Sequence, residues 1–232
     1  MNENPARPDD AAPLQRVRVW DLPVRIFHWA LVLLFCFSWW SGKEGGNAMQ
    51  YHLWSGYAIL TLVLFRLAWG FIGSSSARFA DFTRGPRAVR AYLRALRVSE
   101  CPAHLGLNPL GGWSVLLMLA SLALQTGTGL FANDDVSTEG PLYNWVGKAT
   151  SDFLTAIHYY NFYVLLVLVV LHVAAVLYYL FHRSENLVTP MFTGYKLRAP
   201  GGTDSPVRFA GTTLAAITLA AAAVAVYLLV RK

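Results

Sequence analysis

Five continuous apolar segments run along the chain, over approximately residues 26–42, 51–72, 110–131, 153–180 and 207–230. Each is about as long as a helix that crosses the hydrocarbon layer of a bilayer, or longer. Within lipid, only helices and closed barrels satisfy all their backbone hydrogen bonds. The segments do not alternate between apolar and polar positions, which excludes a barrel. The pattern therefore predicts an all-α integral membrane protein with five transmembrane helices.

Composition agrees with this pattern. Hydrophobic residues make up 55% of the chain and charged residues 14%, against roughly 25% charged in a soluble domain. The formal net charge is +6, and most of the positive residues lie in the tail and in the loops between the apolar segments. This distribution is typical of membrane topology and lipid headgroups rather than of nucleic-acid binding. We expect membrane lipid, and no nucleic acid, among the partners.

The distribution of arginine and lysine predicts the orientation. The first and third loops carry one lysine each, Lys43 and Lys148, whereas the tail and the other two loops are basic. Because basic loops stay in the cytoplasm, the N-terminus is expected inside and the C-terminus outside. The basic residues of the tail and of the second and fourth loops are Arg7, Arg16, Arg18, Arg25, Arg78, Arg84, Arg87, Arg90, Arg94, Arg97, Arg183, Lys196 and Arg198.

The second loop contains an amphipathic segment over residues 86–98. Pro86 suits the first position of a helix, and the arginines of the segment recur on one face, opposite Val89, Tyr92 and Leu93. The pattern predicts a helix that lies on the membrane surface against anionic lipid.

Four of the six histidines lie within the predicted spans: His28, His52, His158 and His172. His158 and His172 are 14 residues apart, so they share one helix face about 21 Å apart along the axis. The direction of each helix then gives the depth of each histidine. His52 and His158 are expected near the outer surface, and His28 and His172 near the inner one. The sequence thus predicts two histidine pairs.

Two imidazoles on facing helices are the axial ligands that a six-coordinate haem requires. Zinc would need a third or fourth ligand, and a di-iron centre would need carboxylates inside the bundle. We read no Asp or Glu within the five segments, and Cys-x-x-Cys-His, the attachment motif of c-type haem, is absent. The pairs therefore predict two non-covalent haems b.

Arg66 and two glycines are further candidates for cofactor contacts. Arg66 follows His52 by 14 residues and lies on the same face, near the inner pair. A buried arginine needs a partner; a haem propionate would serve, and lipid headgroups are the alternative. Gly56 and Gly70 lie one turn beyond His52 and Arg66, where they would let a flat macrocycle approach. Glycine is also common at ordinary contacts between membrane helices.

These residues, taken together, resemble the prokaryotic cytochrome b561 family and the related cytochrome b subunits of nickel-iron hydrogenases and formate dehydrogenases. The resemblance covers approximately residues 15–198. The residues that carry it are the stretch from Val17 to Trp29, His52-x-x-x-Gly56, Arg66-x-x-Trp69-Gly70, Asn108-Pro109-Leu-Gly111, His158 and His172.

The resemblance implies a four-helix bundle in the bacterial inner membrane whose two haems b are held by the same four histidines. It also implies electron exchange between a quinone (ubiquinone or menaquinone) and a periplasmic partner, such as a c-type cytochrome or an oxidoreductase subunit. The segment from Pro102 to Leu107 is similar to a family loop near the inner haem, so the resemblance implies that His104 lies near this haem. The fifth helix is additional, and its alanine-rich faces favour close packing, including in a homo-oligomer.

The expected division of the chain is a cytoplasmic tail (1–25), a di-haem membrane domain (26–198), and a linker with an additional transmembrane helix (199–232). Two other functions stay open. A superoxide oxidase that reduces quinone would need a basic funnel beside the outer haem, for which Lys43 and Lys148 are the candidates. A channel or assembly factor would use the histidines for packing only.

Overall fold

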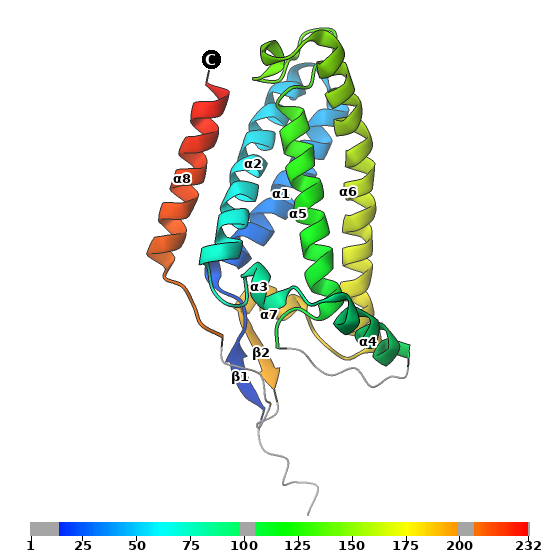
Figure 1. Ribbon diagram of the computed structural model, residues 1–232, viewed down its shortest axis with the longest axis vertical. Helices are drawn as coiled ribbons and strands as arrows, with labels where there is room; N and C mark the ends of the chain where they lie inside the picture. Colours follow the sequence, from blue (N-terminus) through cyan, green and yellow to red (C-terminus); the bar gives the residue numbers. More distant parts are fainter. Residues whose placement is uncertain (1–13, 98–104, 199–206, 232) are drawn as a thin grey trace, which may run out of the picture.

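The computed structural model describes residues 14–97, 105–198 and 207–231, in which five long helices form an elongated bundle (Figure 1). All five are long and apolar enough to cross a membrane, which confirms the predicted all-α membrane fold. They are α1 (Leu22–Glu44), α2 (Met49–Ile72), α5 (Pro109–Gly129), α6 (Lys148–His182) and α8 (Thr212–Val230).

Two of these helices begin at capping residues that the sequence displays. The Asp21 side chain accepts a hydrogen bond from the Val24 backbone amide at 2.8 Å and starts α1. The Asn108 side chain accepts one from the Gly111 amide at 2.7 Å and starts α5. A proline follows each cap within the first turn, where it loses no helical hydrogen bond.

The helix ends differ from the predicted segments at two places. α6 has 35 residues, about 52 Å at the usual rise, so it extends beyond the hydrocarbon layer. α8 begins at Thr212 rather than near residue 207. The residues before it are held in an extended path, because the Ala210 amide donates to Ser74 Oγ and the Ser75 amide donates to the Arg208 carbonyl.

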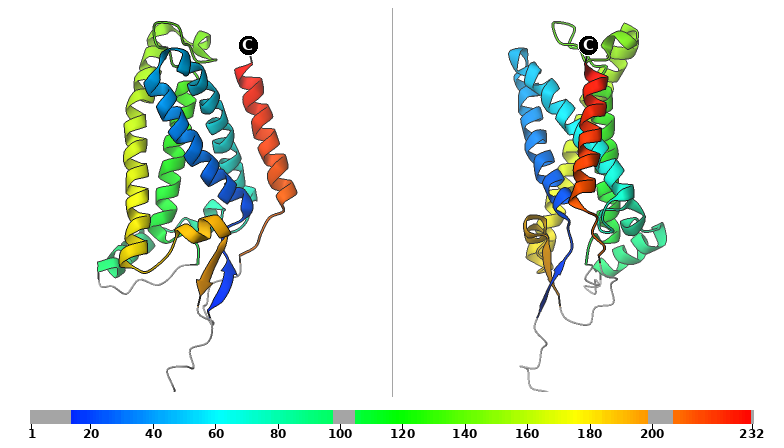
Figure 2. Two further views of the ribbon diagram at one scale, coloured as in Figure 1. Left: turned by 180° about the vertical axis from the view of Figure 1, so that it is seen from behind. Right: turned by 90° about the vertical axis from the view of Figure 1, so that its left-hand side faces the viewer.

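The bundle consists of two antiparallel hairpins and an outer helix. α1 packs along α2, α5 packs along α6, and α2 contacts α5. α8 packs against α2 at the edge of the bundle, away from α6 (Figures 1 and 2). Among the described helices, α6 makes no extensive backbone contact with α1 or α2. The space between the hairpins is therefore bridged by side chains.

Short elements complete the two ends of the bundle. η2 (Gly46–Ala48) and η3 (Tyr143–Trp145) lie between the long helices at one end. At the opposite end lie α3 (Phe79–Phe82), α4 (Pro86–Arg97), α7 (Val188–Thr193) and a two-stranded sheet (Figure 1).

The sheet changes the expected division of the chain. β1 (Gln15–Arg18) pairs antiparallel with β2 (Tyr195–Arg198), and Arg16 lies 4.7 Å from the centre of the Tyr195 ring. α1 also begins before residue 26. Residues 15–25, expected in a separate tail, thus pack with the membrane domain, because β1 finds its hydrogen-bonding partner 180 residues later in the chain.

The amphipathic segment of the second loop forms α4, as expected. Arg87, Arg90 and Arg94 are exposed on it. Tyr92 is buried, and its hydroxyl is 2.7 Å from that of Tyr179 near the end of α6. One face of α4 is therefore attached to the bundle while the arginines point outward.

Candidate functional site

The structure brings the four histidines together in the two expected pairs. His28 on α1 faces His172 on α6, with ring centroids 6.4 Å apart. His52 on α2 faces His158 on α6, with ring centroids 6.1 Å apart. In the described part of the chain, no group of three or more His, Cys, Asp or Glu side chains is gathered as a zinc site would require.

Both spacings fit one metal atom between two imidazoles. Two rings that bind opposite sides of a metal atom through bonds of about 2 Å have centroids roughly 6.3 Å apart. Each of the measured separations is close to that value. The ring planes make angles of 54° in the inner pair and 82° in the outer pair, which a bis-histidine site tolerates because each ring turns about its own metal–nitrogen bond.

In the outer pair, hydrogen bonds orient both rings. His52 Nδ1 is 2.9 Å from the Ser38 carbonyl oxygen, and His158 Nδ1 is 2.8 Å from the Gln125 carbonyl oxygen. A carbonyl oxygen only accepts, so Nδ1 carries the proton in each ring. The lone pair of Nε2 is then available for a metal, the usual arrangement of a metal-binding histidine.

Two glycines make room for these rings. A Cβ atom on Gly42 would lie 2.8 Å from His52 Nδ1, and one on Gly129 would lie 2.9 Å from His158 Cε1. Any larger residue at either position would displace the ring. We did not predict these two residues, although Gly42 precedes His52 by only ten residues across the turn between α1 and α2.

An apolar cavity opens between His52 and His158. Phe35, Trp39, Leu122, Phe162 and Leu165 are among the residues that line it. Its wall is suited to a flat hydrophobic ligand that both imidazoles can reach.

The two predicted glycines differ in their surroundings. Gly56 lines the cavity, and a Cβ atom there would meet nothing within 4 Å, which agrees with the expected open approach. At Gly70, a Cβ atom would collide with the Phe79 ring of α3. The space beside Gly70 is therefore filled by this ring, and the expected approach of a macrocycle at Gly70 would require the ring to move.

Two buried polar atoms, one on His28 of the inner pair and one on Arg66 of α2, have no partners among the described residues. They are His28 Nδ1 and Arg66 Nη1. Arg66 is only 4% exposed, and its guanidinium lies 5.3 Å from the centre of the Phe79 ring. Buried polar groups are nearly always satisfied, so Arg66 Nη1 fits a site for an anionic group.

Although no Asp or Glu falls within the five apolar segments, a carboxylate does lie near Arg66. Asp21, the cap of α1, is buried, accepts a hydrogen bond from Trp69 Nε1 at 3.0 Å, and interacts electrostatically with Arg66. Asp21 precedes the first apolar segment, and only the packing of α1 on α2 brings it beside Arg66. Asp21 therefore balances part of the charge, while Nη1 keeps no partner.

Three other polar residues that could bear on the site have separate surroundings or lie outside the described residues. His182 stacks on Tyr178 at the end of α6, with centroids 5.2 Å apart. Arg25 donates a hydrogen bond to the Phe192 carbonyl in α7. His104 lies outside the described residues.

Histidine donors at haem spacing, glycines that seat the rings and buried unpaired polar atoms together fit haem, and comparisons with known proteins agree. The pattern of the family described as prokaryotic cytochrome b561 matches residues 19–194. A protein of Rhizobium leguminosarum bv. viciae, named "Probable Ni/Fe-hydrogenase B-type cytochrome subunit", is 26% identical in an alignment 226 residues long. The alignment covers 83% of this chain and 93% of the relative. No solved structure matches the chain. The chain therefore belongs to the prokaryotic cytochrome b561 family of membrane b-type cytochromes, which bind haem b.

Proposed function

We propose that the chain binds two haems b and passes electrons across the bacterial inner membrane, between the quinone pool and a periplasmic redox partner. The carrying observation is the presence of two histidine pairs, each at the spacing of bis-histidine ligation. Their α6 ligands are separated by 14 residues, about 21 Å of helix, so two haems would span much of the hydrocarbon layer.

The two histidines of each pair support a role in electron transfer. When bound, the haem supplies an iron that changes oxidation state. His52 and His158 would hold the outer haem, and His28 and His172 would hold the inner one. Two imidazole ligands for each iron would favour electron transfer over the binding of oxygen or substrate. Arg66 would pair with a propionate near the inner haem.

The partner is inferred from orientation and from the relative. With a cytoplasmic N-terminus, the His52–His158 pair lies near the periplasmic surface. The Rhizobium protein is named as a subunit of a nickel-iron hydrogenase. By analogy, we expect an oxidoreductase subunit or a c-type cytochrome to exchange electrons with the outer haem, and ubiquinone or menaquinone to complete the path.

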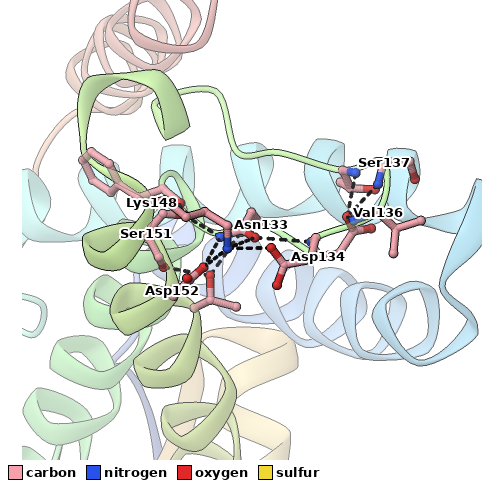
Figure 3. Close-up of polar contacts among 11 residues, drawn as sticks. Asn133, Asp134, Val136, Ser137, Lys148, Ser151 and Asp152 are labelled. Carbon is pink, nitrogen blue, oxygen red and sulfur yellow. Dashed lines mark hydrogen bonds and ion pairs between the residues drawn. The ribbon is translucent and has the colours of Figure 1, made fainter.

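The charges of the outer loop do not favour superoxide as the substrate. Lys148 Nζ is 2.5 Å from Asp135 Oδ1 and also pairs with Asp152, within the polar network drawn in Figure 3. A cleft nearby is lined by Asn47, Gln50 and Glu139 among others. A carboxylate in the cleft and a neutralised lysine would repel, rather than attract, a small anion.

Haem content tests the proposal directly. The purified protein should show a reduced-minus-oxidised spectrum of low-spin b haem, and pyridine extraction should give two haems per chain. Protein expressed with ample haem that holds one haem, or none, would contradict the proposal. A spectrum without haem would instead favour a channel or assembly factor.

Substitution of the ligands should act by pair. His52→Ala and His158→Ala should each remove the same spectral component, and His28→Ala and His172→Ala should each remove the other. The reason is that each iron needs both of its axial ligands to stay six-coordinate. Redox titration of the four variants checks this. If His28→Ala and His158→Ala removed the same component, the proposed pairing would be wrong.

A further inference from the structure

The two histidine pairs differ in the hydrogen bonds of their rings. In the outer pair, both Nδ1 atoms lie within 2.9 Å of a backbone carbonyl oxygen, that of Ser38 or of Gln125. In the inner pair, His28 Nδ1 is buried and has no partner among the described residues. The outer ligands are therefore held by the protein at the atom opposite the metal-binding nitrogen, whereas no described residue holds His28 in this way.

A polar network inside the membrane supports the outer ligand His158. Asn161 Nδ2 donates to Gln125 Oε1 at 2.7 Å and to the Ser121 carbonyl at 3.0 Å. Ser121 Oγ donates to Asn161 Oδ1 at 3.0 Å. Ser121 and Asn161 are both buried. The network joins α5 to α6 within one turn of His158.

Gln125 contacts His158 at two points. Its backbone carbonyl accepts from the ring Nδ1 at 2.8 Å, and its side-chain Nε2 donates to the His158 carbonyl at 3.0 Å. The side-chain Oε1 is in turn held by Asn161. This set of bonds restrains both the backbone and the ring of His158, because a shift of α5 along α6 would break all of them together.

A hydrogen bond from Nδ1 to a carbonyl changes the electronic character of an axial imidazole. The bond makes the ring a stronger electron donor through Nε2. Stronger donation stabilises ferric iron, which carries more positive charge than ferrous iron, and so lowers the reduction potential. An imidazole whose Nδ1 has no acceptor lacks this contribution.

We propose that Gln125, Asn161 and Ser121 are positioning residues for His158, and that the bonds to the Ser38 and Gln125 carbonyls hold the outer haem at a lower reduction potential than the inner one. This inference rests on the proposed function, since it requires a haem in each pair.

The positive charge of Arg66 near the inner pair also favours a higher reduction potential of the inner haem. Arg66 is the charged side chain buried in the inner half of α2. A fixed positive charge disfavours ferric iron and raises the reduction potential, and burial weakens the screening of this effect. Asp21 opposes part of it. The difference in ring hydrogen bonds and the net effect of Arg66 therefore add.

Redox titration of substituted proteins tests the inference. Gln125→Met removes the side-chain bonds at nearly constant volume, and Ser121→Ala removes only the far end of the network. The control is Thr61→Val on α2, because the Thr61 hydroxyl donates to the Tyr57 carbonyl of its own helix at 2.9 Å. His158→Met identifies the outer component, since a thioether ligand raises the potential of the haem that it binds.

We expect the parent to show two components, with the outer one at the lower potential. Gln125→Met should raise the outer potential, Ser121→Ala should raise it less, and Thr61→Val should leave both unchanged. Selective loss of the outer haem in Gln125→Met would also support the positioning role. Two haems with unshifted potentials in both network variants, or an outer potential above the inner one, would overturn the inference alone. Fewer than two haems in the parent would contradict the proposed function itself.

Discussion

At the scale of single residues, the absence of a side chain at Gly129 matters as much as the presence of the histidine beside it. A Cβ atom there would press on the His158 ring at 2.9 Å. Such overpacking typically costs about 1–3 kcal/mol, which corresponds to an approximately 5- to 150-fold loss of affinity. Gly129→Ala should therefore weaken retention of the outer haem selectively, as measured by haem content after dilution.

Gly127→Ala is the matched control. Gly127 lies on the same helix two residues earlier, and a Cβ atom there would meet nothing within 4 Å. This variant should keep two haems per chain. Equal haem retention in both variants would show that the His158 ring can shift without loss of haem, and that the site does not require glycine at position 129.

Arg66 gives a second prediction at this scale. Its guanidinium is buried with Nη1 unpaired, and we expect it to stabilise the ferrous state of the inner haem. Arg66→Leu should therefore lower the inner reduction potential and leave the outer one, about 21 Å away along the helix, nearly unchanged. Redox titration measures both.

Arg78→Leu controls for the loss of a positive charge, since Arg78 is half-exposed and pairs with Asp81 at 2.7 Å. Surface pairs of this kind contribute little, so neither potential should move. If the potentials were unchanged in Arg66→Leu as they are in Arg78→Leu, Arg66 would have only a structural role beside Asp21 and Phe79.

At the scale of elements, α8 is separable from the candidate site. It packs against α2, with Ala215, Ala222 and Val226 buried. None of its residues lines the cavity between His52 and His158. The matched family region also ends at residue 194. α8 thus adds apolar contacts to the bundle without supplying a ligand.

Removal of residues 207–232 should leave both haems in place. The shortened protein should keep two haems per chain and the parent spectrum, but unfold at a lower temperature, because the face of α2 that α8 covers becomes exposed to lipid or detergent. Thermal melts followed at the haem absorbance measure this. Loss of either haem on shortening would mean that α8 holds the bundle in its binding geometry.

At the scale of the whole molecule, the basic elements gather at one end. The two-stranded sheet, α3, α4 and α7 lie together at the end opposite the C-terminal end of α8 (Figures 1 and 2). The opposite end carries the outer loop, in which three backbone amides donate to the Asp134 carboxylate and hold the pKa of Asp134 well below its usual range. The excess of Arg and Lys at one end, rather than the acidic residues at the other, is the asymmetry that orients membrane proteins with their basic end in the cytoplasm.

The orientation makes a direct prediction. Alkaline phosphatase, which is active only outside the cytoplasm, should be active when fused after Lys232 and inactive when fused within the second loop, near α4. A cytoplasmic fluorescent protein should show the reverse. The opposite result at both positions would show that the orientation is reversed and that the His52–His158 pair lies on the cytoplasmic side.

The helices and the histidine pairs could be read from the chain because both depend on local regularities. Continuous apolar segments can only be helices in lipid, and 14 residues on a straight helix return nearly to the same face. The same reasoning placed α4, whose arginines recur with helical spacing. The approximate ends of the segments moved by a few residues where caps such as Asp21, or bonds such as those to Ser74, set the boundary.

Other features depended on contacts between residues far apart in the sequence. The pairing of β1 with β2, the placement of Asp21 beside Arg66, and the filling of the space at Gly70 by Phe79 all arise when elements pack. No periodicity marks such contacts, because each depends on the relative position of two elements rather than on either alone.

By itself, the sequence determined the membrane fold, the number of spans and the identity of the four histidines, since hydrophobic length and helical spacing are properties of each segment. Only the tertiary structure decided how the histidines are held. The rings of His52 and His158 are hydrogen-bonded to the carbonyls of Ser38 and Gln125 on neighbouring helices. The space that the rings occupy exists because Gly42 and Gly129 have no side chains. Ring orientation and room depend on the register between helices, which packing sets.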